Sequence, residues 1–223
     1  IGHAGGSGSG SRTVGAGQGL NVGESLTVGY DAAGVLTISN GGLVENTLGF
    51  IGDAASSTGT VTVDNGTWNN SSNLLVGYYG SGELTISNGG QVANTYGNIG
   101  YWAGSTGTVT VDGGIWTNRA SLNVGGGSSA GGIGLLNVSN SGTVNVADTL
   151  KVWPGGTVEL LGGQTNTESL IVESGGTLIL DRGELSTVNL TGSGTFRFDS
   201  GTLRLEGGEI SLAGPLDIHG DGT

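Results

Sequence analysis

The sequence predicts an all-β protein, a right-handed parallel β-helix (β-solenoid) of about eight or nine rungs with roughly 20–25 residues each. The first observation is a 48-residue repeat: residues 26–73 open with LTVGYDAAGVLTISNGGLVENT and residues 74–121 with LLVGYYGSGELTISNGGQVANT. The second is that each unit has two halves of one pattern, an alternating strand, an Asn-Gly or Gly-Gly turn and an apolar residue. The third is the content of 50 glycines and two prolines without a Gly-X-Y period, which excludes collagen.

The two halves of each unit make the rung about 24 residues long, and columns of equivalent residues test this length. One apolar column precedes a glycine on every rung and recurs at alternating steps of 23 and 25: Val28, Ile51, Val76, Ile99 and Val124. A second column alternates valine with tryptophan: Val44, Trp68, Val92, Trp116 and Val144. Alternating volume is typical of interior positions, so we expect both tryptophans to be buried.

The repeat divides the chain into three parts. Residues 1–25 form a Gly/Ser-rich, incomplete first rung, and residues 26–149 form the solenoid of 48-residue double-rung repeats. Residues 150–223 continue it with shorter, more charged rungs, because LKVWPGGTVELLGG at 150–163 returns as LIVESGGTLILDRG at 170–183. We expect the chain to start in mid-rung, since Ile1 matches the register of Val28, and to stop in an unfinished rung.

Elementary physical chemistry explains why such a sequence forms a solenoid. A short strand with one apolar face has no core of its own, but strands stacked at about 4.8 Å cover the apolar faces of their neighbours. Glycine and asparagine supply the positive φ angles that the corners of each rung require. The parallel connections are expected to be right-handed.

The unit G-x-L-T-[IV]-S-N-G-G-x-V resembles the passenger repeats of bacterial autotransporters and related surface proteins over roughly residues 20–160. The resemblance implies a right-handed β-helix that serves as an adhesin, a biofilm factor or a stalk. It also implies an extracellular location or one on the bacterial cell surface.

Composition excludes several classes of partner. The net charge of −12, with six Lys and Arg residues, argues against nucleic acid and against anionic membrane surfaces. The absence of cysteine excludes disulfides and thiolate metal sites, and no apolar segment is long enough for membrane insertion. We expect no cofactor and no metal. The expected partners are cell-surface glycans or proteins, or other copies of the chain.

Aromatic residues form the candidate contact site. Tyr30, Tyr78 and Tyr101 each follow a Val-Gly or Ile-Gly pair on a different rung, and Tyr79 and Trp102 follow two of them. If the preceding residue points inward, this column lies at a corner, where exposed rings can stack on sugars or receive a protein. The alternative is that the rings cover an apolar corner of the solenoid.

Three polar columns have structural interpretations. Asn40, Asn65, Asn88 and Asn140 are expected to form an amide ladder. Asp64 and Asp112 lie two rungs apart, about 10 Å, which is too far for one metal ion. The threonine column at 37, 62, 85 and 110 fits β-propensity better than ice binding.

A catalytic site is not expected. Enzymes of this architecture need carboxylates clustered at one groove with an arginine or lysine nearby, and here the charges alternate in sign as in solvent-facing salt bridges. The charged residues concerned are Asp181, Arg182, Glu184, Arg197, Asp199, Arg204, Glu206 and Glu209. The expected function is a non-catalytic structural or adhesive rod. The alternatives are a self-assembling extracellular filament or sheath subunit and, more distantly, a polysaccharide-active enzyme, for which the His219-Gly220 pair is the one partial motif.

Overall fold

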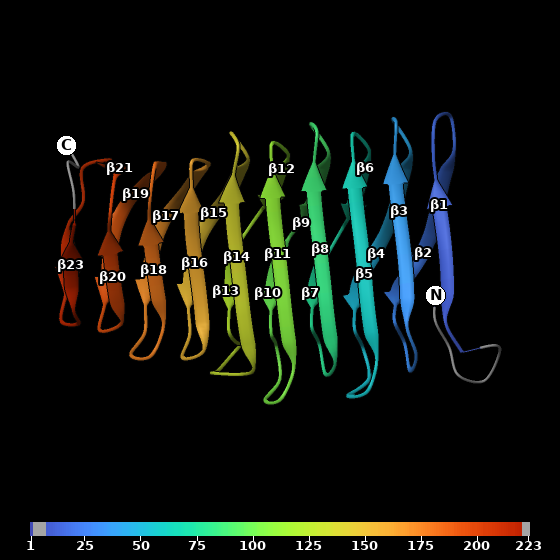
Figure 1. Cartoon of the computed structure of the whole chain (residues 1–223), viewed down its shortest axis with the longest axis horizontal. Helices are drawn as coiled ribbons and strands as arrows, with labels where there is room; N and C mark the ends of the chain where they lie inside the picture. Colours follow the sequence, from blue (N-terminus) through green and yellow to red (C-terminus); the bar gives the residue numbers. More distant parts are fainter. Residues whose placement is uncertain (2–7, 220–223) are drawn as a thin grey trace.

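The computed structural model describes residue 1 and residues 8–219, which contain 23 strands and no helix. The strands pair in parallel and stack along one axis from the N-terminal to the C-terminal end (Figure 1). In Figure 1 the chain rises along the front strands, crosses to the back at the top and descends behind, while it advances from the N-terminal to the C-terminal end. This sense of rotation makes the coil right-handed. Ten strands at the front define nine turns, and the predicted β-solenoid is confirmed.

Each rung has three sides, and the first side is the ten-stranded sheet. Its strands are β1 (Gly10–Val14), β3 (Gly34–Ser39), β5 (Thr58–Asp64), β8 (Ser81–Ser87), β11 (Thr106–Asp112), β14 (Ile133–Ser139), β16 (Gly156–Leu161), β18 (Thr177–Leu180), β20 (Thr195–Phe198) and β23 (Leu216–Ile218).

The second and third sides belong to one sheet of 13 strands that bends between them. Five long strands run across both sides: β2 (Gly19–Val28), β4 (Leu43–Ile51), β15 (Thr143–Val152), β17 (Gln164–Val172) and β19 (Gly183–Gly192). The second side also holds β6 (Thr67–Asn70), β9 (Gln91–Asn94), β12 (Ile115–Asn118) and β21 (Gly201–Leu205). The third side also holds β7 (Asn73–Val76), β10 (Tyr96–Ile99), β13 (Leu122–Val124) and β22 (Ile210–Leu212).

The strand register confirms the columns that the repeat predicts. Val28 pairs with Ile51, and the pairing continues through Val76 and Ile99 to Val124. The carbonyl of Ile1 accepts from Gly29 N at 2.8 Å, as that of Val28 does from Gly52 N, so Ile1 takes the predicted register. Strand β2 crosses the boundary expected at residue 25, and β15 crosses the one expected at residue 149.

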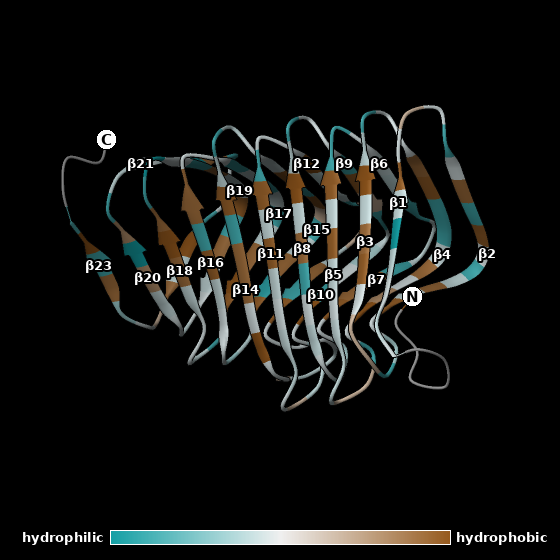
Figure 2. Ribbon diagram, turned by 45° about the vertical axis from the view of Figure 1, so that its right-hand side comes forward, coloured by the Kyte–Doolittle hydropathy of each residue, from teal (hydrophilic) through white to brown (hydrophobic). Residues whose placement is uncertain are grey.

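The interior is one continuous cluster of apolar side chains. Apolar and polar residues alternate along the strands (Figure 2). Trp68 and Trp116 are fully buried, as predicted. A Cβ on Gly49 would lie 2.8 Å from Leu74 Cδ1 and 3.1 Å from Trp68 Cζ2, and Gly97 stands in the same relation to Trp116. Each tryptophan therefore occupies the space that the glycine of the preceding rung leaves open.

Bonds between stacked asparagine amides occur in a column other than the predicted one. Asn40, Asn65, Asn88 and Asn140 all have positive φ angles at the corner after the first side. Their amides do not bond to one another within the described chain; Asn88 Nδ2 donates to Asp64 at 2.7 Å, and Asn140 Nδ2 to Asp112 at 2.6 Å. The prediction of an asparagine ladder here was therefore wrong, because the left-handed turn directs these side chains outward to the neighbouring aspartates.

The bonds between asparagine amides are buried at the corner between the second and third sides, where they join residues in pairs. Asn46 Nδ2 donates to Asn70 Oδ1 at 2.6 Å, and Asn46 Oδ1 accepts from Trp68 Nε1 at 2.6 Å. The same arrangement recurs 48 residues later. Asn94 donates to Asn118 at 2.7 Å and accepts from Trp116 at 2.7 Å. Each buried indole N–H thus has an acceptor on the preceding rung, which satisfies a group that would be costly to bury unpaired.

Candidate functional site: the aromatic corner

The five aromatic residues predicted as a contact ridge lie at one corner, where the third side returns to the first. Tyr78 N donates to Gly52 O at 3.1 Å, and Tyr101 N donates to Gly77 O at 2.9 Å, so the corner residues stack rung upon rung. Gly52 and Gly77 both have a φ of 72°, and an added Cβ would meet backbone atoms of the next rung. Glycine is needed here because this corner folds back tightly on its neighbour.

One of the two inner tyrosines of this corner contacts a phenylalanine on the third side, and the other packs against that tyrosine. The Tyr78 ring lies 5.2 Å from that of Phe50 and 5.4 Å from that of Tyr101, with tilted or edge-on geometry. Leu75 pairs with Phe50 on the next rung. Its place between inward-facing residues puts it on the outer face, yet its side chain is only 5% exposed. Tyr78 and Tyr101 are themselves half-buried. Tyr78 therefore takes the covering role that the sequence left as the alternative, and Tyr101 packs beside it on the next rung.

The outer pair has a different environment. Tyr79 and Trp102 stack with ring centroids 5.7 Å apart and an interplanar angle of 10°. Tyr79 is 46% exposed and Trp102 is 42% exposed, while Tyr30 on an earlier rung is 47% exposed. The predicted ridge thus separates into a half-buried layer of Tyr78 and Tyr101 and an exposed layer. We use the name aromatic corner for Tyr30, Phe50, Tyr78, Tyr79, Tyr101 and Trp102.

A glycine-rich loop closes the C-terminal end of the aromatic corner. This loop, residues 125–132, contains the four-residue insertion of the third repeat. A Cβ on Gly127 would collide with the Tyr101 ring, and a Cβ on Gly126 would lie 3.0 Å from the Trp153 indole. The backbone therefore lies directly against both rings, and it separates the aromatic corner from Trp153.

Carboxylates accompany these rings. Asp53 occupies the corner column between Tyr30 and Tyr78, since Asp53 N donates to Gly29 O at 2.8 Å. Burial raises the pKa of the Asp53 carboxyl above its ordinary value. The pKa of Tyr79 is also raised, first by desolvation and then by Tyr78, with a smaller contribution from the charge of Asp53. The Asp53 side chain makes no hydrogen bond or ion pair within the part of the chain that the structure describes.

Phe50 is the functional candidate that the sequence analysis missed. It belongs to the third side, one rung before Leu75, and not to the Val-Gly-aromatic motif that identified the others. Its position before the inward-facing Ile51 would have placed it on the outer face, next to the corner. The chain has three phenylalanines, so one that faces outward beside the aromatic column could have been recognised as part of the same surface.

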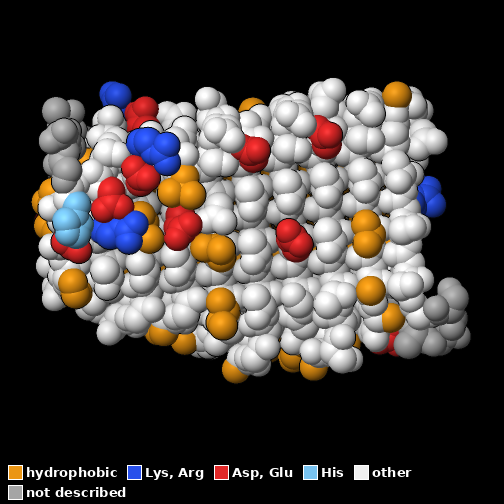
Figure 3. All heavy atoms as spheres, in the orientation of Figure 1, with side chains coloured by type: hydrophobic (Ala, Val, Ile, Leu, Met, Phe, Trp, Pro, Cys, Tyr) orange, Lys and Arg blue, Asp and Glu red, His pale blue; other side chains and the backbone are white. Residues whose placement is uncertain are grey.

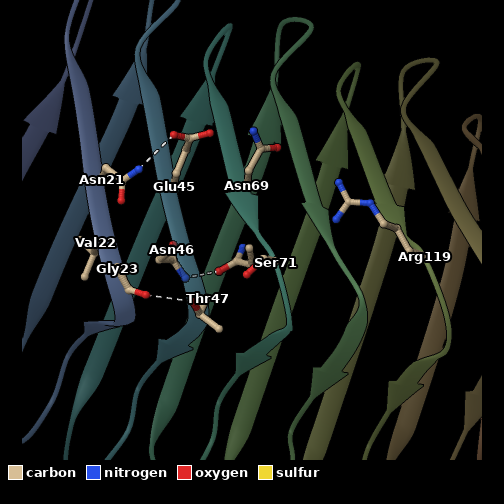
Figure 4. Close-up of a pocket in the computed structure, with 10 residues that line it drawn as sticks. Asn21, Val22, Gly23, Glu45, Asn46, Thr47, Asn69, Ser71 and Arg119 are labelled. Carbon is tan, nitrogen blue, oxygen red and sulfur yellow. Dashed lines mark hydrogen bonds between the residues drawn. The ribbon is translucent and has the colours of Figure 1, made fainter.

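Two shallow hollows line the corner between the second and third sides. One of about 400 Å³ extends along residues 21–23, 45–47 and 69–71, and one of about 500 Å³ extends along residues 117–119, 145–147 and 166–167. Figure 4 shows Asn21 donating to Glu45 in the first hollow, at 3.3 Å, with Arg119 set apart from both. These hollows are lined mainly by amides, hydroxyls and backbone, and they hold no pair of carboxylates.

The charged residues of the C-terminal rungs are engaged with one another. Arg197 pairs with Asp199 at 2.8 Å, and Arg204 pairs with Glu184 at 3.3 Å. His219 Nε2 lies 3.3 Å from Asp217 Oδ1. Gly220, the second residue of the partial His-Gly motif, lies outside the described residues. No group of three or more His, Cys, Asp or Glu side chains in residues 8–219 could hold a metal ion.

Comparisons with known proteins found no matching family model, no matching curated protein and no matching solved structure. Within residues 8–219 there is no helix long and apolar enough to cross a membrane. The arguments about function therefore start from the geometry of the aromatic corner.

Proposed function

We propose that this chain is a non-catalytic structural and adhesive rod that works outside a bacterial cell. The observation that carries the proposal is the stacked, exposed pair of Tyr79 and Trp102 on a rigid solenoid corner. Large exposed rings are uncommon on a surface without a partner, and here they stand side by side on successive rungs. The ladders of parallel hydrogen bonds beneath them fix the spacing of the rings before a partner arrives.

A rod of stacked rungs suits this role because each rung is held by its neighbours. A preorganised surface loses little conformational entropy when it binds, which favours contacts made by rigid aromatic side chains. The partners we propose are cell-surface glycans or proteins. The resemblance of the repeat to autotransporter passengers supports the same location and role.

The test is binding to a glycan array and to immobilised cell-surface proteins, with wild-type protein and a Tyr79→Ala/Trp102→Ala variant. Removing two exposed contact rings is expected to weaken binding at least about tenfold, because anchor residues of this kind contribute about 1–2 kcal/mol each or more. Tyr96→Ala is the matched control, since Tyr96 begins β10 and is 48% exposed without a ring contact to the aromatic corner. Equal binding by all three proteins would contradict the proposal.

A self-assembling filament is the second candidate function. The last described rungs expose Leu216 by 51%, Ile218 by 62% and Ile210 by 47%. In a filament these side chains would be covered by a rung of the next copy, as every interior rung is covered here. Electron microscopy of the purified chain tests this: fibres with an axial repeat of about 4.8 Å support it, and single short rods contradict it.

A further inference from the structure

We propose that the aromatic corner binds a cation, namely the ammonium group of a lysine in a basic segment of a partner protein. The inference rests on the proposed adhesive function and names the chemistry that the same surface recognises. Its basis is a set of aromatic rings next to a carboxylate without a partner, in a part of the chain that carries negative charge alone.

The charge of this region is one-sided. Between residues 13 and 118 the sequence contains no lysine, arginine or histidine. The same stretch contains seven acidic residues: Glu24, Asp31, Glu45, Asp53, Asp64, Glu83 and Asp112. A surface with a single sign of charge attracts partners of the opposite sign and repels acidic ones. A basic segment is therefore the complementary partner for this half of the rod.

The rings supply the second component of a cation site. Tyr79 and Trp102 are close to half exposed, and their stacking engages one ring against the other. The face of an aromatic ring carries negative potential and attracts an ammonium group, most strongly for tryptophan. Asp53 lies one rung before Tyr78, and its carboxylate has no hydrogen bond or ion pair within the described residues. The charge of Asp53 acts on Tyr79, whose ring also stacks on Trp102, so a cation beside Tyr79 would find a ring face and a carboxylate together.

The molecule contains the completed version of this arrangement further along the same corner. Lys151 Nζ lies 3.9 Å from the centroid of the Trp153 ring and 2.7 Å from Glu173 Oε1. Trp153 occupies the corner position directly after the third side, which Gly125 occupies on the preceding rung. Its N–H donates to Val124 O at 2.8 Å, as the corner glycines do to the equivalent carbonyls on earlier rungs. In this position the chain supplies its own cation to a ring and a carboxylate. At the aromatic corner the ring and the carboxylate are present, and the cation must come from another molecule.

Other ligands fit this surface less well. A small metal ion requires several oxygen ligands, and residues 8–219 hold no suitable group of acidic or imidazole side chains. A neutral sugar could stack on the rings but would bring no positive charge to the Asp53 carboxylate. An acidic glycan would be repelled by all seven carboxylates of this half.

The experiment measures binding of a synthetic lysine-containing peptide and of the same peptide with every lysine Nε-acetylated. Acetylation removes the positive charge and keeps the backbone and most of the side chain. Titrations are followed by NMR at low salt on the full chain. The unmodified peptide is expected to bind at least about tenfold more tightly, and the difference is expected to shrink at high salt as screening increases.

Three variants locate the site. Asp53→Asn and Trp102→Ala are each expected to weaken binding of the unmodified peptide about five- to tenfold. Glu83→Gln is the matched control, because it removes one charge from an exposed position on the first side, in β8; it is expected to change binding less than about twofold. Because burial raises the pKa of Asp53, binding should also fall as the pH drops through that raised pKa, and this dependence should be absent in Asp53→Asn.

The outcomes separate this inference from the proposed function. Equal binding of the acetylated and unmodified peptides, or equal losses with Asp53→Asn and Glu83→Gln, overturns the cation site. Binding of a neutral glycan that requires Trp102 but not Asp53 keeps the adhesive function and also overturns the cation site. If Trp102→Ala changes neither peptide nor glycan binding, both proposals fall. Asp53→Asn is expected to fold normally, because its charged form is disfavoured by burial.

Discussion

The rungs up to about residue 146 and the rungs after residue 150 share one cross-section but differ in their repeat. In the first region the chain repeats every two rungs, and in the second it repeats every rung of about 20 residues, as Leu150 to Leu170 and Leu170 to Leu190 show. Both regions stack in parallel with an apolar interior. The difference therefore concerns what fills the interior and how its polar groups are satisfied.

Hydrogen bonding at the corner between the second and third sides explains the change of repeat. In the first region, buried asparagines bond in pairs that span two rungs, and each pair accepts one indole N–H. In the second region, threonines take this place. The Thr167 hydroxyl shares its single proton between the carbonyls of Asp148 and Ser169, at 3.1 and 3.0 Å, and the Thr187 hydroxyl lies in the same way between those of Glu168 and Asn189. A threonine that bonds to backbone makes every rung equivalent, whereas an asparagine pair needs two.

Interior volume follows the same rule. Tryptophan and glycine complement each other across two rungs in the first region, as do valine and leucine in the intervening positions. The second region uses aliphatic side chains of similar size on every rung. The length of the repeat is thus the smallest number of rungs that fills the interior and pairs its polar groups.

The outer surfaces differ as well. Charged side chains gather over the C-terminal rungs, where acidic and basic residues lie together, and are sparse over the rest of the first side (Figure 3). In the C-terminal rungs the charges form exposed ion pairs, which contribute little stability each. Between residues 13 and 118 the sequence has seven acidic residues and no basic one. We therefore expect a charged partner to bind the N-terminal half, where the acidic residues of the sequence have no basic counterparts between residues 13 and 118.

The largest expected effect tests the complementarity of tryptophan and glycine. Gly49→Leu is expected to destabilise the fold by about 3 kcal/mol, because the new side chain would overlap Trp68 and Leu74. Trp68→Val alone is expected to cost about 3–5 kcal/mol through the cavity it leaves and the lost bond to Asn46. Urea unfolding followed by circular dichroism gives both values.

The double variant Gly49→Leu/Trp68→Val is the decisive member of this series. It recreates the valine-over-leucine combination of the neighbouring rungs, so its destabilisation should be smaller than the sum of the two single changes by more than about 1 kcal/mol. Strictly additive effects would show that the two positions do not share one space. The comparison of the regions would then lose its basis in packing.

A medium effect of opposite signs is expected from two threonines of the second region. Thr165 is fully buried, and its Oγ1 has no partner within the described residues. Thr165→Val keeps the shape and removes this unpaired hydroxyl, so it should stabilise the fold by about 1 kcal/mol. Thr167→Val removes the hydroxyl whose proton bonds to backbone carbonyls and should destabilise the fold by about 1 kcal/mol. Thermal unfolding of the two variants measures the contrast, and shifts of the same sign would contradict it.

The smallest expected effect concerns the charged surface of the second region. The pKa of Asp181 is lowered, first by the hydrogen bond from Ser200 at 2.9 Å and then by Arg182. A lowered pKa in the folded state contributes stability above the ordinary pKa, and this contribution is lost as the pH falls through the lowered value. Ser200→Ala should therefore reduce stability by less than about 1 kcal/mol at pH 7.

The pH dependence provides the control for this last variant. As the pH falls through the lowered pKa of Asp181 and its carboxylate becomes protonated, the difference between Ser200→Ala and the wild type should diminish. An NMR titration of the Asp181 carboxyl should show its pKa rising towards the ordinary value in the variant. An unchanged pKa would mean that Ser200 does not stabilise the carboxylate.

Much of the architecture could be predicted from residue order. The 48-residue repeat placed Val28, Ile51 and Val76 in one column, and the alternation of Val44 with Trp68 marked an interior position. These predictions held because a parallel stack in register converts sequence periodicity directly into contacts. The asparagines of the first corner were assigned a ladder that they do not form, because equivalent spacing does not reveal whether a side chain points inward.

The sequence by itself determined the solenoid, the register of its rungs, its acidic N-terminal half and the residues of the aromatic column. Only the tertiary structure decided that Tyr78 packs against Phe50 of the third side, with Tyr101 beside it, while Tyr79 and Trp102 stand exposed. It also brought Phe50 to the ridge and paired Trp68 with Asn46 and Gly49. The physical reason is that periodicity fixes which residues share a column, whereas the direction of each side chain at a corner depends on turn geometry and on the space left by the adjacent rung.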